Sequence, residues 1–334
     1  MQRSIRLARS DMSAPTDYLI DRRRMRRKLG WWRLAAIAAV GFAFIVMVSR
    51  VTGADSTDKL TPHIARLSLQ GMILGDKDTI DLIKKIGESS QAKAVLLTID
   101  SPGGTTTGAE KLYEELRRLN EKKPVVAVVG AVAASGAYIA AIAADTIVAQ
   151  GNSLVGSIGV LFQYPNFYKL LDNVGVKVEE VKSSPLKAAP NGLEPTSEAA
   201  RAAVASLVAD SYAWFKDLVK ERRHLDDAAL AKVSDGRVFT ARQGVPLKLV
   251  DILGGEREAI AWLEKDKGVT KDLPVRDWKK KGSLERLGLV EGAASASRLL
   301  GLDSVALLLD QAVASERRGT LDGLLAIWQG FDAR

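Results

Sequence analysis

The sequence contains no cysteine, and only two of its 334 residues are histidine. The absence of cysteine excludes disulfide scaffolds, thiolate metal sites and cysteine nucleophiles. His63 and His224 lie far apart in the sequence, which leaves little material for a zinc site or for a Ser-His-Asp triad. With 47% hydrophobic residues, the chain is long enough for one large domain or two ordinary ones.

Most of the chain also has little net charge. The formal net charge is +8, but residues 1–33 contain ten Lys or Arg and three Asp, a net charge of +7. Residues 34–334 therefore carry only +1. A basic channel for nucleic acid is not expected in such a body, and we predict no nucleic-acid partner.

A basic segment followed by an apolar one predicts a membrane anchor near the N-terminus. Residues 22–28 hold six Arg or Lys, and residues 34–48 are uncharged. A helix from Trp31 to the end of this run rises about 27 Å, close to the roughly 30 Å of a hydrocarbon layer. Because basic flanks stay on the cytoplasmic side, we expect a cytoplasmic tail over residues 1–33 and a transmembrane anchor over residues 34–50.

A cleaved secretory signal remains an alternative to the anchor, with Val51-Thr52-Gly53 as a poor cleavage site. In both cases the chain after residue 50 is exported. We therefore expect the main domain on the periplasmic or extracytoplasmic side of the inner membrane. Residues 51–62 are polar, contain Gly and Pro, and predict a linker.

From His63 onward, short apolar strands alternate with helices, which predicts an α/β fold whose strands are buried on both faces. The expected strands are residues 63–69, 93–99, 125–130, 145–149, 156–161 and 177–182. The expected helices are residues 78–89, 107–120, 135–144, 165–174, 197–222 and 226–233. Residues 237–265 predict a further strand, helix, strand and helix.

We place the main domain at residues 63–270. Beyond it, leucines at helical spacing in residues 299–313 and 321–331 predict a C-terminal helical tail over residues 271–334. Such helices pack on the domain or on a neighbouring subunit, or lie on a membrane surface.

Two predicted strand-to-helix turns carry residues suited to chemistry. The turn from Asp100 to Gly104 ends in two glycines, which let backbone N–H groups approach a ligand closely. Ser135 lies among small residues that leave room for a substrate. The functional interpretation is that Ser135 is a nucleophile and that the N–H of Gly136 helps to bind an oxyanion. Each turn also has an ordinary interpretation, a plain βα turn for the first and a helix N-cap for the serine.

A third loop contains two lysines, Lys182 and Lys187, and is otherwise typical of solvated surface. A serine enzyme without a usable histidine needs another base, and a neutral lysine is the main substitute. Burial or a neighbouring cation must favour the neutral amine for this role. Lys187 is followed by Ala188-Ala189-Pro190 and has less charged company than most lysines of the chain.

These loops belong to a series of motifs that follow one another in order. The motifs are Ser101-Pro102-Gly103-Gly104, Ala134-Ser135-Gly136-Ala137-Tyr138, Gly156-Ser157-Ile158-Gly159-Val160, Lys182-Ser183 with Lys187, Gly236-Arg237-Val238-Phe239-Thr240-Ala241-Arg242-Gln243, and Leu249-Val250-Asp251 with Gly254-Gly255. The series resembles the signal peptide peptidase family of membrane-anchored serine peptidases, in its short bacterial form with a single catalytic repeat. The first motif alone is weak, since crotonases and Clp peptidases carry similar turns, but the whole series in register is specific. The resemblance covers roughly residues 60–270, which we interpret as a Ser/Lys peptidase domain.

The resemblance implies a role for each matched residue. Ser135 occupies the position of the nucleophile, Lys187 that of the general base, and Ser157 that of a supporting serine that hydrogen-bonds the lysine. The backbone of the family's oxyanion hole is matched by Gly103, Gly104 and Gly136. The implied chemistry is acyl transfer through Ser135, for which no metal or cofactor is required.

The resemblance also implies a fold, an assembly and a substrate. The family fold is the Clp/crotonase-like spiral of ββα units, and its members form homo-oligomeric rings, octamers in the short form. In these rings the serine and the lysine of one site come from neighbouring subunits, although this sequence leaves open whether Lys187 reaches its own Ser135 or a neighbour's. The implied substrates are apolar remnants of signal peptides, which reach an enzyme held at the membrane by its N-terminal helix.

The base loop departs from the common family pattern, because Ser184 and Leu186 stand where many members have Gly and Tyr. This difference predicts a different backbone path around Lys187. Two other functions remain as alternatives, a crotonase-like enzyme acting on acyl-CoA and a non-catalytic membrane scaffold that only forms rings. The export signal and the Ser135/Lys187 pair argue against both.

Overall fold

The computed structural model describes residues 31–32, 58–279 and 325–327. The chain divides into two compact units, residues 1–58 and 59–334, and the sheet and helices of the second unit contain the residues matched by the motifs. The predicted anchor over residues 34–50 and most of the predicted linker and tail lie outside the described residues. Within the part of the chain that the structure describes, no helix is long and apolar enough to span a membrane.

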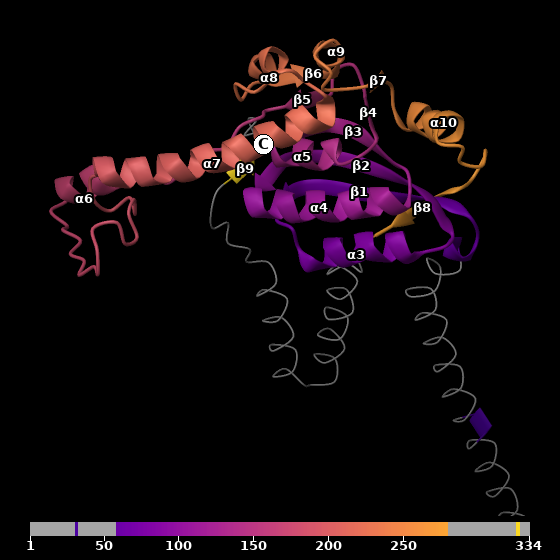
Figure 1. The fold of residues 1–334 in the computed structure, drawn as a ribbon. Helices are drawn as coiled ribbons and strands as arrows, with labels where there is room; N and C mark the ends of the chain where they lie inside the picture. Colours follow the sequence, from indigo (N-terminus) through magenta and orange to yellow (C-terminus); the bar gives the residue numbers. More distant parts are fainter. Residues whose placement is uncertain (1–30, 33–57, 280–324, 328–334) are drawn as a thin grey trace, which may run out of the picture. The chain divides into compact units, whose positions relative to one another are not determined.

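A mainly parallel sheet forms the centre of the second unit, in the order β6-β5-β3-β2-β1-β8, with β4 on β3, β7 on β4 and β9 on β2 (Figure 1). The strands are β1 (His63–Ile73), β2 (Ala92–Thr105), β3 (Val125–Ala134), β4 (Thr146–Ala149), β5 (Leu154–Gly156), β6 (Val238–Thr240), β7 (Ile252–Leu253), β8 (Val275–Trp278) and β9 (Leu325–Ile327). The pairs β2/β9 and β5/β6 are antiparallel. This sheet confirms the predicted α/β class.

Helices connect the strands. They are the 3-10 helix η1 (Asp58–Leu60) and the α-helices α3 (Lys77–Glu88), α4 (Thr106–Lys122), α5 (Gly136–Ile142), α6 (Tyr168–Asn173), α7 (Glu198–Arg223), α8 (Asp227–Val233), α9 (Ala241–Gly244) and α10 (Glu256–Asp266). Three of the longer helices begin at side-chain caps, since Asp76, Thr105 and Ser197 each accept a hydrogen bond from the backbone N–H three residues later. These caps satisfy N–H groups that have no partner within the helix.

Different helices cover the two faces of the sheet. Side chains alternate between the faces along β2, so that Val95 and Leu97 pack with α3, α4 and α5, whereas Leu96 packs with Leu263 of α10. Burial on both faces explains why the strands are continuous apolar runs rather than alternating ones.

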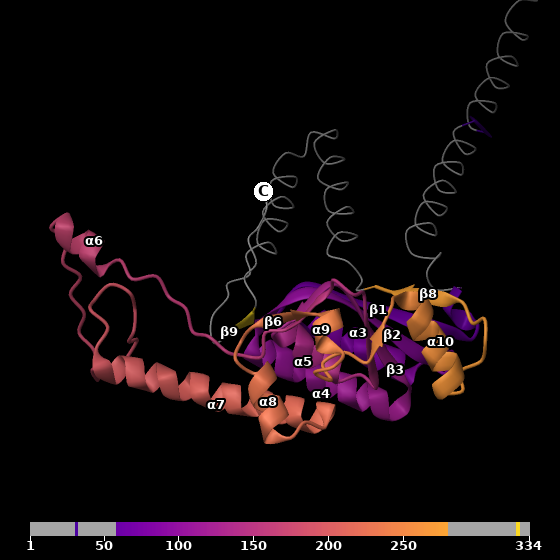
Figure 2. The ribbon, with the colours of Figure 1, turned by 90° about the horizontal axis from the view of Figure 1, so that it is seen from above.

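One long excursion leaves this core. We name residues 164–213 the arm: it contains α6 and the first part of α7, which project away from the sheet (Figures 1 and 2). Within the arm only Gly192 and Ala200 are buried. The helix α7 becomes anchored to the core only near its end, where Phe215 and Val219 are buried.

Most predicted elements are confirmed to within a few residues, but four differ. Residues 157–160 form no strand, because Gly156 and Ser157 both have positive φ and end the extended backbone of β5. Residues 177–182 also form no strand, since they lie on the arm beside no partner strand. The strands β8 and β9 were not predicted, and both lie within the segment expected to be a helical tail. Because β8 pairs with β1, the sheet extends beyond residue 270.

Candidate active site

Three of the sequence motifs meet at neighbouring strand ends. The register pairs Ser101 of β2 with Ala133 of β3, and Ala134 of β3 with Gly156 of β5. The glycine turn at the end of β2, Ser135 directly after β3 and Ser157 directly after β5 therefore lie at the same ends of three adjacent strands. Ligands bind at such edges in α/β proteins, where loops from several strands converge.

Ser135 has an unusual backbone conformation, with φ 55° and ψ −120°. Ser135 occupies the N-cap position of α5, as the sequence indicated, but its side chain makes no capping hydrogen bond. The turn is instead held by the backbone: Ser135 N–H donates to Gly156 O at 2.8 Å, and Tyr138 N–H donates to Ser135 O at 2.9 Å. A residue other than glycine costs about 1–3 kcal/mol in such a conformation and is retained where the surroundings enforce it.

The helix that follows Ser135 is buried throughout, from Gly136 to Ile142. The hydroxyl of Tyr138 donates to Leu249 O at 3.0 Å, and burial raises the pKa of this phenol well above its ordinary value. At the other end of α5, Arg222 donates to Ile142 O at 2.8 Å and to Ala144 O at 2.9 Å. Ser135 thus sits at the start of a helix that is tethered from both ends.

Two arginines and an asparagine satisfy the backbone carbonyls at the end of α5. Arg117 and Asn120 both donate to Ala143 O, at 3.1 and 3.0 Å, beside the contacts of Arg222. Burial, and then the nearby charge of Arg117, lower the pKa of Arg222. Sequence reasoning missed these residues, because nothing in the local pattern of α4 or α7 indicates which carbonyls a distant side chain will reach.

The glycine turn is packed against β1. The hydroxyl of Ser101 donates to Gly71 O at 2.6 Å, and Gly103 N–H donates to Ser101 Oγ at 3.1 Å. A Cβ atom on Gly104 would lie 1.9 Å from Ile73 O, so only glycine fits this position. Of the two predicted oxyanion donors in the turn, Gly103 already has an intramolecular acceptor for its N–H.

The edge of this turn also pairs with a strand from the end of the chain. Gly103, Gly104 and Thr105 lie opposite β9 in an antiparallel register. This edge of β2 therefore accommodates an extended segment of polypeptide beside the predicted oxyanion hole.

Ser157 lies next to Ser135 because Gly156 pairs with the residue before it. Its backbone has φ 51°, and its N–H donates to Arg237 O at 2.8 Å. The Gly236–Gln243 motif thus supports the turn that presents Ser157. The side chain is largely buried, with 8% of the residue exposed.

Lys187 lies apart from these three turns. It belongs to the arm, in the connection between α6 and α7, which Figures 1 and 2 show at the far end of α7 from the core. Its side chain is exposed, and its N–H donates to Ser184 O at 3.1 Å within a turn. From Phe215, where α7 is anchored, back to its start at Glu198 is a helical rise of about 26 Å.

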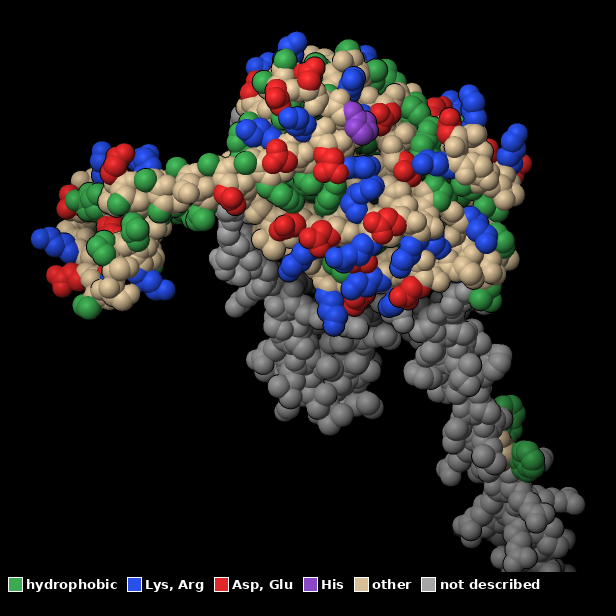
Figure 3. All heavy atoms as spheres, in the orientation of Figure 1, with side chains coloured by type: hydrophobic (Ala, Val, Ile, Leu, Met, Phe, Trp, Pro, Cys, Tyr) green, Lys and Arg blue, Asp and Glu red, His purple; other side chains and the backbone are tan. Residues whose placement is uncertain are grey.

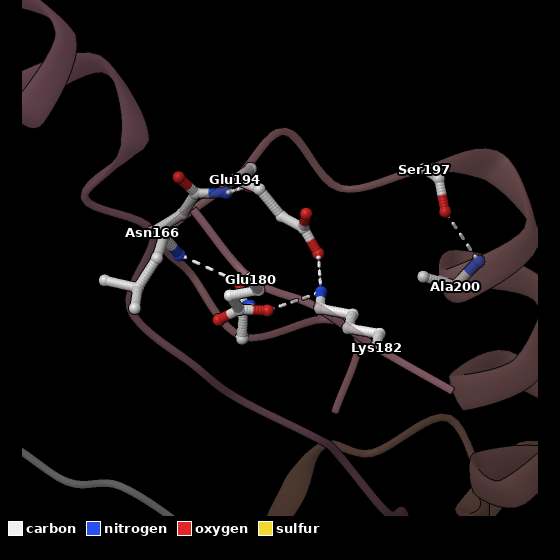
Figure 4. A network of polar contacts seen from close by, with 8 residues as sticks. Asn166, Glu180, Lys182, Glu194, Ser197 and Ala200 are labelled. Atoms are coloured by element: carbon white, nitrogen blue, oxygen red, sulfur yellow. Dashed lines mark hydrogen bonds and ion pairs between the residues drawn. The ribbon is translucent and has the colours of Figure 1, made fainter. Parts of the chain in front are cut away.

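The other lysine of this loop is paired. Lys182 Nζ lies 2.7 Å from Glu180 Oε2 and 2.6 Å from Glu194 Oε1 (Figure 4). Hydrogen bonds to Glu180 and then Glu194 raise the pKa of Lys182 above its ordinary value of 10.5. Lys182 therefore keeps its proton at neutral pH and is unsuited to act as a base.

Both histidines have structural positions. The ring of His63 is buried, with Nδ1 2.7 Å from Thr61 O and Nε2 accepting from Trp278 Nε1 at 3.1 Å. His224 ends α7 in a left-handed conformation. Asp100 accepts a hydrogen bond from Val132 N–H at 3.2 Å and so braces two strand ends.

Comparisons with known proteins agree with the series of motifs. Peptidase family S49 matches residues 117–270. A putative protease of Synechocystis sp. is 35% identical over 200 residues, which are 60% of this chain and 72% of the relative. A putative signal peptide peptidase SppA of Enterococcus faecium is 31% identical over 198 residues, or 59% of this chain and 57% of that protein. Protease 4 of Haemophilus influenzae is 28% identical over 225 residues, or 64% of this chain and 36% of the longer relative.

The α/β fold, the strained serine turn and these relatives define the class of this protein as a protease. The chain belongs to peptidase family S49. The predicted membership of the signal peptide peptidase family is thereby confirmed. The chain spans less than two thirds of the length of the SppA and Protease 4 relatives.

Proposed function

We propose that this chain is a serine endopeptidase in which Ser135 is the nucleophile and Lys187 of a neighbouring copy is the general base. The observation that carries this proposal is the strained backbone of Ser135, which stands at the start of α5 while its side chain makes no capping hydrogen bond. Its neighbours are the glycine turn and Ser157, the other two elements that an acyl-transfer site needs.

The reaction that fits this arrangement is acyl transfer. Neutral Lys187 takes the proton of Ser135 Oγ as the oxygen attacks the peptide carbonyl carbon. The N–H groups of Gly136 and Gly104 hold the resulting oxyanion, Gly103 N–H being engaged by Ser101. The C–N bond then breaks and Lys187 gives its proton to the leaving amine. Water, deprotonated by the same amine, hydrolyses the acyl-enzyme and restores Ser135.

The arm supports a base supplied by a second copy. Its exposed apolar side chains are Phe167, Leu170, Val174, Val176, Val178, Val181, Leu186, Leu193 and Leu207. Figure 3 shows hydrophobic side chains along the arm, interspersed at its tip with Lys, Arg, Asp and Glu. An apolar surface of this extent favours an interface with another protein surface. Docking of the arm would bring Lys187 to a neighbour's Ser135, and burial there would favour the neutral amine.

The remaining family properties belong to the same proposal. A homo-oligomeric ring follows from arms that each serve the next subunit, and a Clp/crotonase-like spiral agrees with the mainly parallel sheet. The edge of β2 that accepts β9 suits an extended peptide added as a strand. We propose apolar signal-peptide remnants as substrates and an N-terminal membrane anchor that exposes the domain outside the cytoplasm. The acyl-CoA and scaffold alternatives find no comparable support.

The test uses two inactive variants of the full-length chain, Ser135→Ala and Lys187→Ala, with cleavage of a short apolar peptide as readout. We expect each variant alone to lose activity on the order of a thousandfold or more. Co-assembled in one particle, the two should regain activity, because some interfaces then join an intact Ser135 to an intact Lys187. If either single variant keeps full activity, the assigned role of that residue is wrong. If a verified mixture stays inactive, the dyad lies within one chain.

A further inference from the structure

The base loop carries a second charged cluster that the catalytic assignment does not use. Glu180, Lys182, Asn191 and Glu194 form it, and we name these four residues the clamp (Figure 4). Besides the two ion pairs of Lys182, Asn191 Nδ2 donates to both oxygens of Glu180, at 2.9 and 3.1 Å. The side chain of Lys182 is only 15% exposed, on an arm where most side chains face solvent.

The clamp closes the loop that contains Lys187. Lys182 and Glu194 enclose residues 183–193, and their contact joins the two ends of this segment. A single exposed ion pair contributes little, but here one ammonium group bridges two carboxylates, one of which an amide also holds. The ion pairs of Lys182 with Glu180 and Glu194 therefore hold the two ends of the loop together, in addition to the connectivity of the backbone.

A backbone contact holds the same end of the loop to the start of the arm. Phe167 N–H donates to Gly192 O at 2.7 Å. Gly192 has φ +77°, and a Cβ atom there would lie 2.1 Å from Pro165 O, so the two segments approach as closely as glycine permits. Both ends of the loop around Lys187 are therefore held in place by these contacts.

The clamp also distinguishes the two lysines of this loop. Lys182 has two carboxylate partners, which raise its pKa above 10.5, so Lys182 keeps its positive charge at neutral pH. Among the described residues, no carboxylate forms an ion pair with Lys187. Lys182 is therefore held by its ion pairs, whereas Lys187 has no carboxylate partner in the part of the chain that the structure describes.

We propose that Lys182, through the clamp, is a positioning residue that sets where Lys187 enters the active site of the neighbouring subunit. This inference rests on the proposed function, since it needs Lys187 as the base. Lys182 itself does not touch the reacting atoms.

The first test compares Lys182→Arg with Lys182→Met in the full-length enzyme. Arginine keeps both ion pairs but cannot act as a base, so we expect Lys182→Arg to retain kcat within about threefold of the wild type, with an unchanged pH profile. Lys182→Met should lower kcat by about a hundredfold with a smaller change in KM, because a displaced base loses rate rather than substrate binding. Lys177→Met, an exposed lysine of the same arm, is the matched control and should leave kcat unchanged.

A charge exchange tests the contact itself. Lys182→Glu should lower kcat strongly, because it breaks both ion pairs. In the double variant Lys182→Glu/Glu194→Lys, kcat should recover by at least about tenfold, because the exchanged ion pair can form again. A Lys182→Arg variant as inactive as Lys187→Ala would overturn the proposal and make Lys182 the base. A Lys182→Met variant with wild-type kcat would equally overturn it.

Mixed assemblies separate this proposal from the dyad. Lys182→Met is placed either in the Ser135→Ala chain, which supplies the lysine, or in the Lys187→Ala chain, which supplies the serine. We expect loss of the restored activity only in the first case; equal loss in both indicates a general folding defect and overturns the positioning role. If the mixture without Lys182→Met is already inactive, the intersubunit dyad fails, and the Arg, Met and charge-exchange variants decide the role of the clamp alone.

Discussion

At the scale of single residues, Ser135 combines two demands that ordinarily conflict. Its φ of 55° with ψ of −120° favours glycine, while the proposed chemistry requires a hydroxyl. The surrounding backbone bonds to Gly156 and Tyr138 enforce this conformation. Conformational strain is therefore stored at the residue that we propose as the nucleophile.

This strain predicts opposite contributions of the serine to activity and to stability. Both Ser135→Gly and Ser135→Ala should abolish peptide cleavage, but Ser135→Gly should be more stable than Ser135→Ala by about 1 kcal/mol, because glycine accepts the positive φ without a Cβ clash. Urea unfolding of the two variants measures the difference. Equal stabilities would mean that the turn is not strained.

At Gly104 the close approach of Ile73 O leaves no room for a side chain. Gly104→Ala should destabilise the protein by about 1–3 kcal/mol and reduce cleavage, since the new methyl group would displace Ile73 O from the turn. The control is Gly87→Ala within α3, where the nearest atom outside the helix, Leu119 Cδ1, is 3.5 Å away. That substitution should stabilise by about 0.5–1 kcal/mol. Thermal unfolding that ranked the two in the reverse order would contradict this packing.

At the scale of elements, α5 and α7 are joined by their ends. Arg222 bonds two carbonyls at the end of α5, and the next residue, Arg223, pairs with Asp251 at 2.6 Å. Asp251 also accepts from Ile147 N–H at 2.8 Å, which links α7 to β4. The last turn of α7 thus anchors both the helix behind Ser135 and the base of the arm.

Arg222→Met should therefore cost about 2 kcal/mol or more, because buried carbonyls lose their donors while the apolar part of the side chain is retained. Arg201→Met, on the exposed part of the same helix, should change stability by less than about 0.5 kcal/mol. Denaturant midpoints of both variants provide the comparison. A loss as large for Arg201→Met would show that helix propensity, and not the cap of α5, is responsible.

The elements also show which sequence signals are reliable. The helices from α3 to α8 were predicted from their hydrophobic period, which is a local property of the sequence. The strand expected at residues 177–182 was wrong, because Val178 and Val181 are exposed on the arm and the segment pairs with no strand of the sheet. The strand β8 was missed because four residues rich in charge become a strand only beside β1.

At the scale of the whole molecule, the arm is the feature that a single copy leaves unsatisfied. Its exposed apolar side chains lie on and beside α6, along the connection between α6 and α7, and on α7, where the core does not cover them. A neighbouring subunit would bury this surface and receive Lys187 in the same contact. Assembly and catalysis are then one property of the protein.

Glutamate substitutions on the arm test this coupling. Leu170→Glu/Val174→Glu should lower the particle mass measured by light scattering and abolish cleavage, while the midpoint of thermal unfolding of the core changes little, because both side chains are already exposed in one copy. Leu253→Glu, on an exposed apolar position of β7, is the control and should leave the assembly intact. A variant that dissociates but remains fully active would contradict a base supplied by a neighbour.

The α/β class, the family and the choice of candidate residues follow from the sequence alone, because hydrophobic period, turn composition and motif order are local properties of the chain. The tertiary structure was needed to show that the Ser135 side chain makes no capping hydrogen bond, that Lys182 is paired while Lys187 is exposed on an arm, and that Arg222 closes the end of α5. These properties depend on contacts between residues far apart in sequence, and such contacts exist only once strand register and helix packing have placed the backbones.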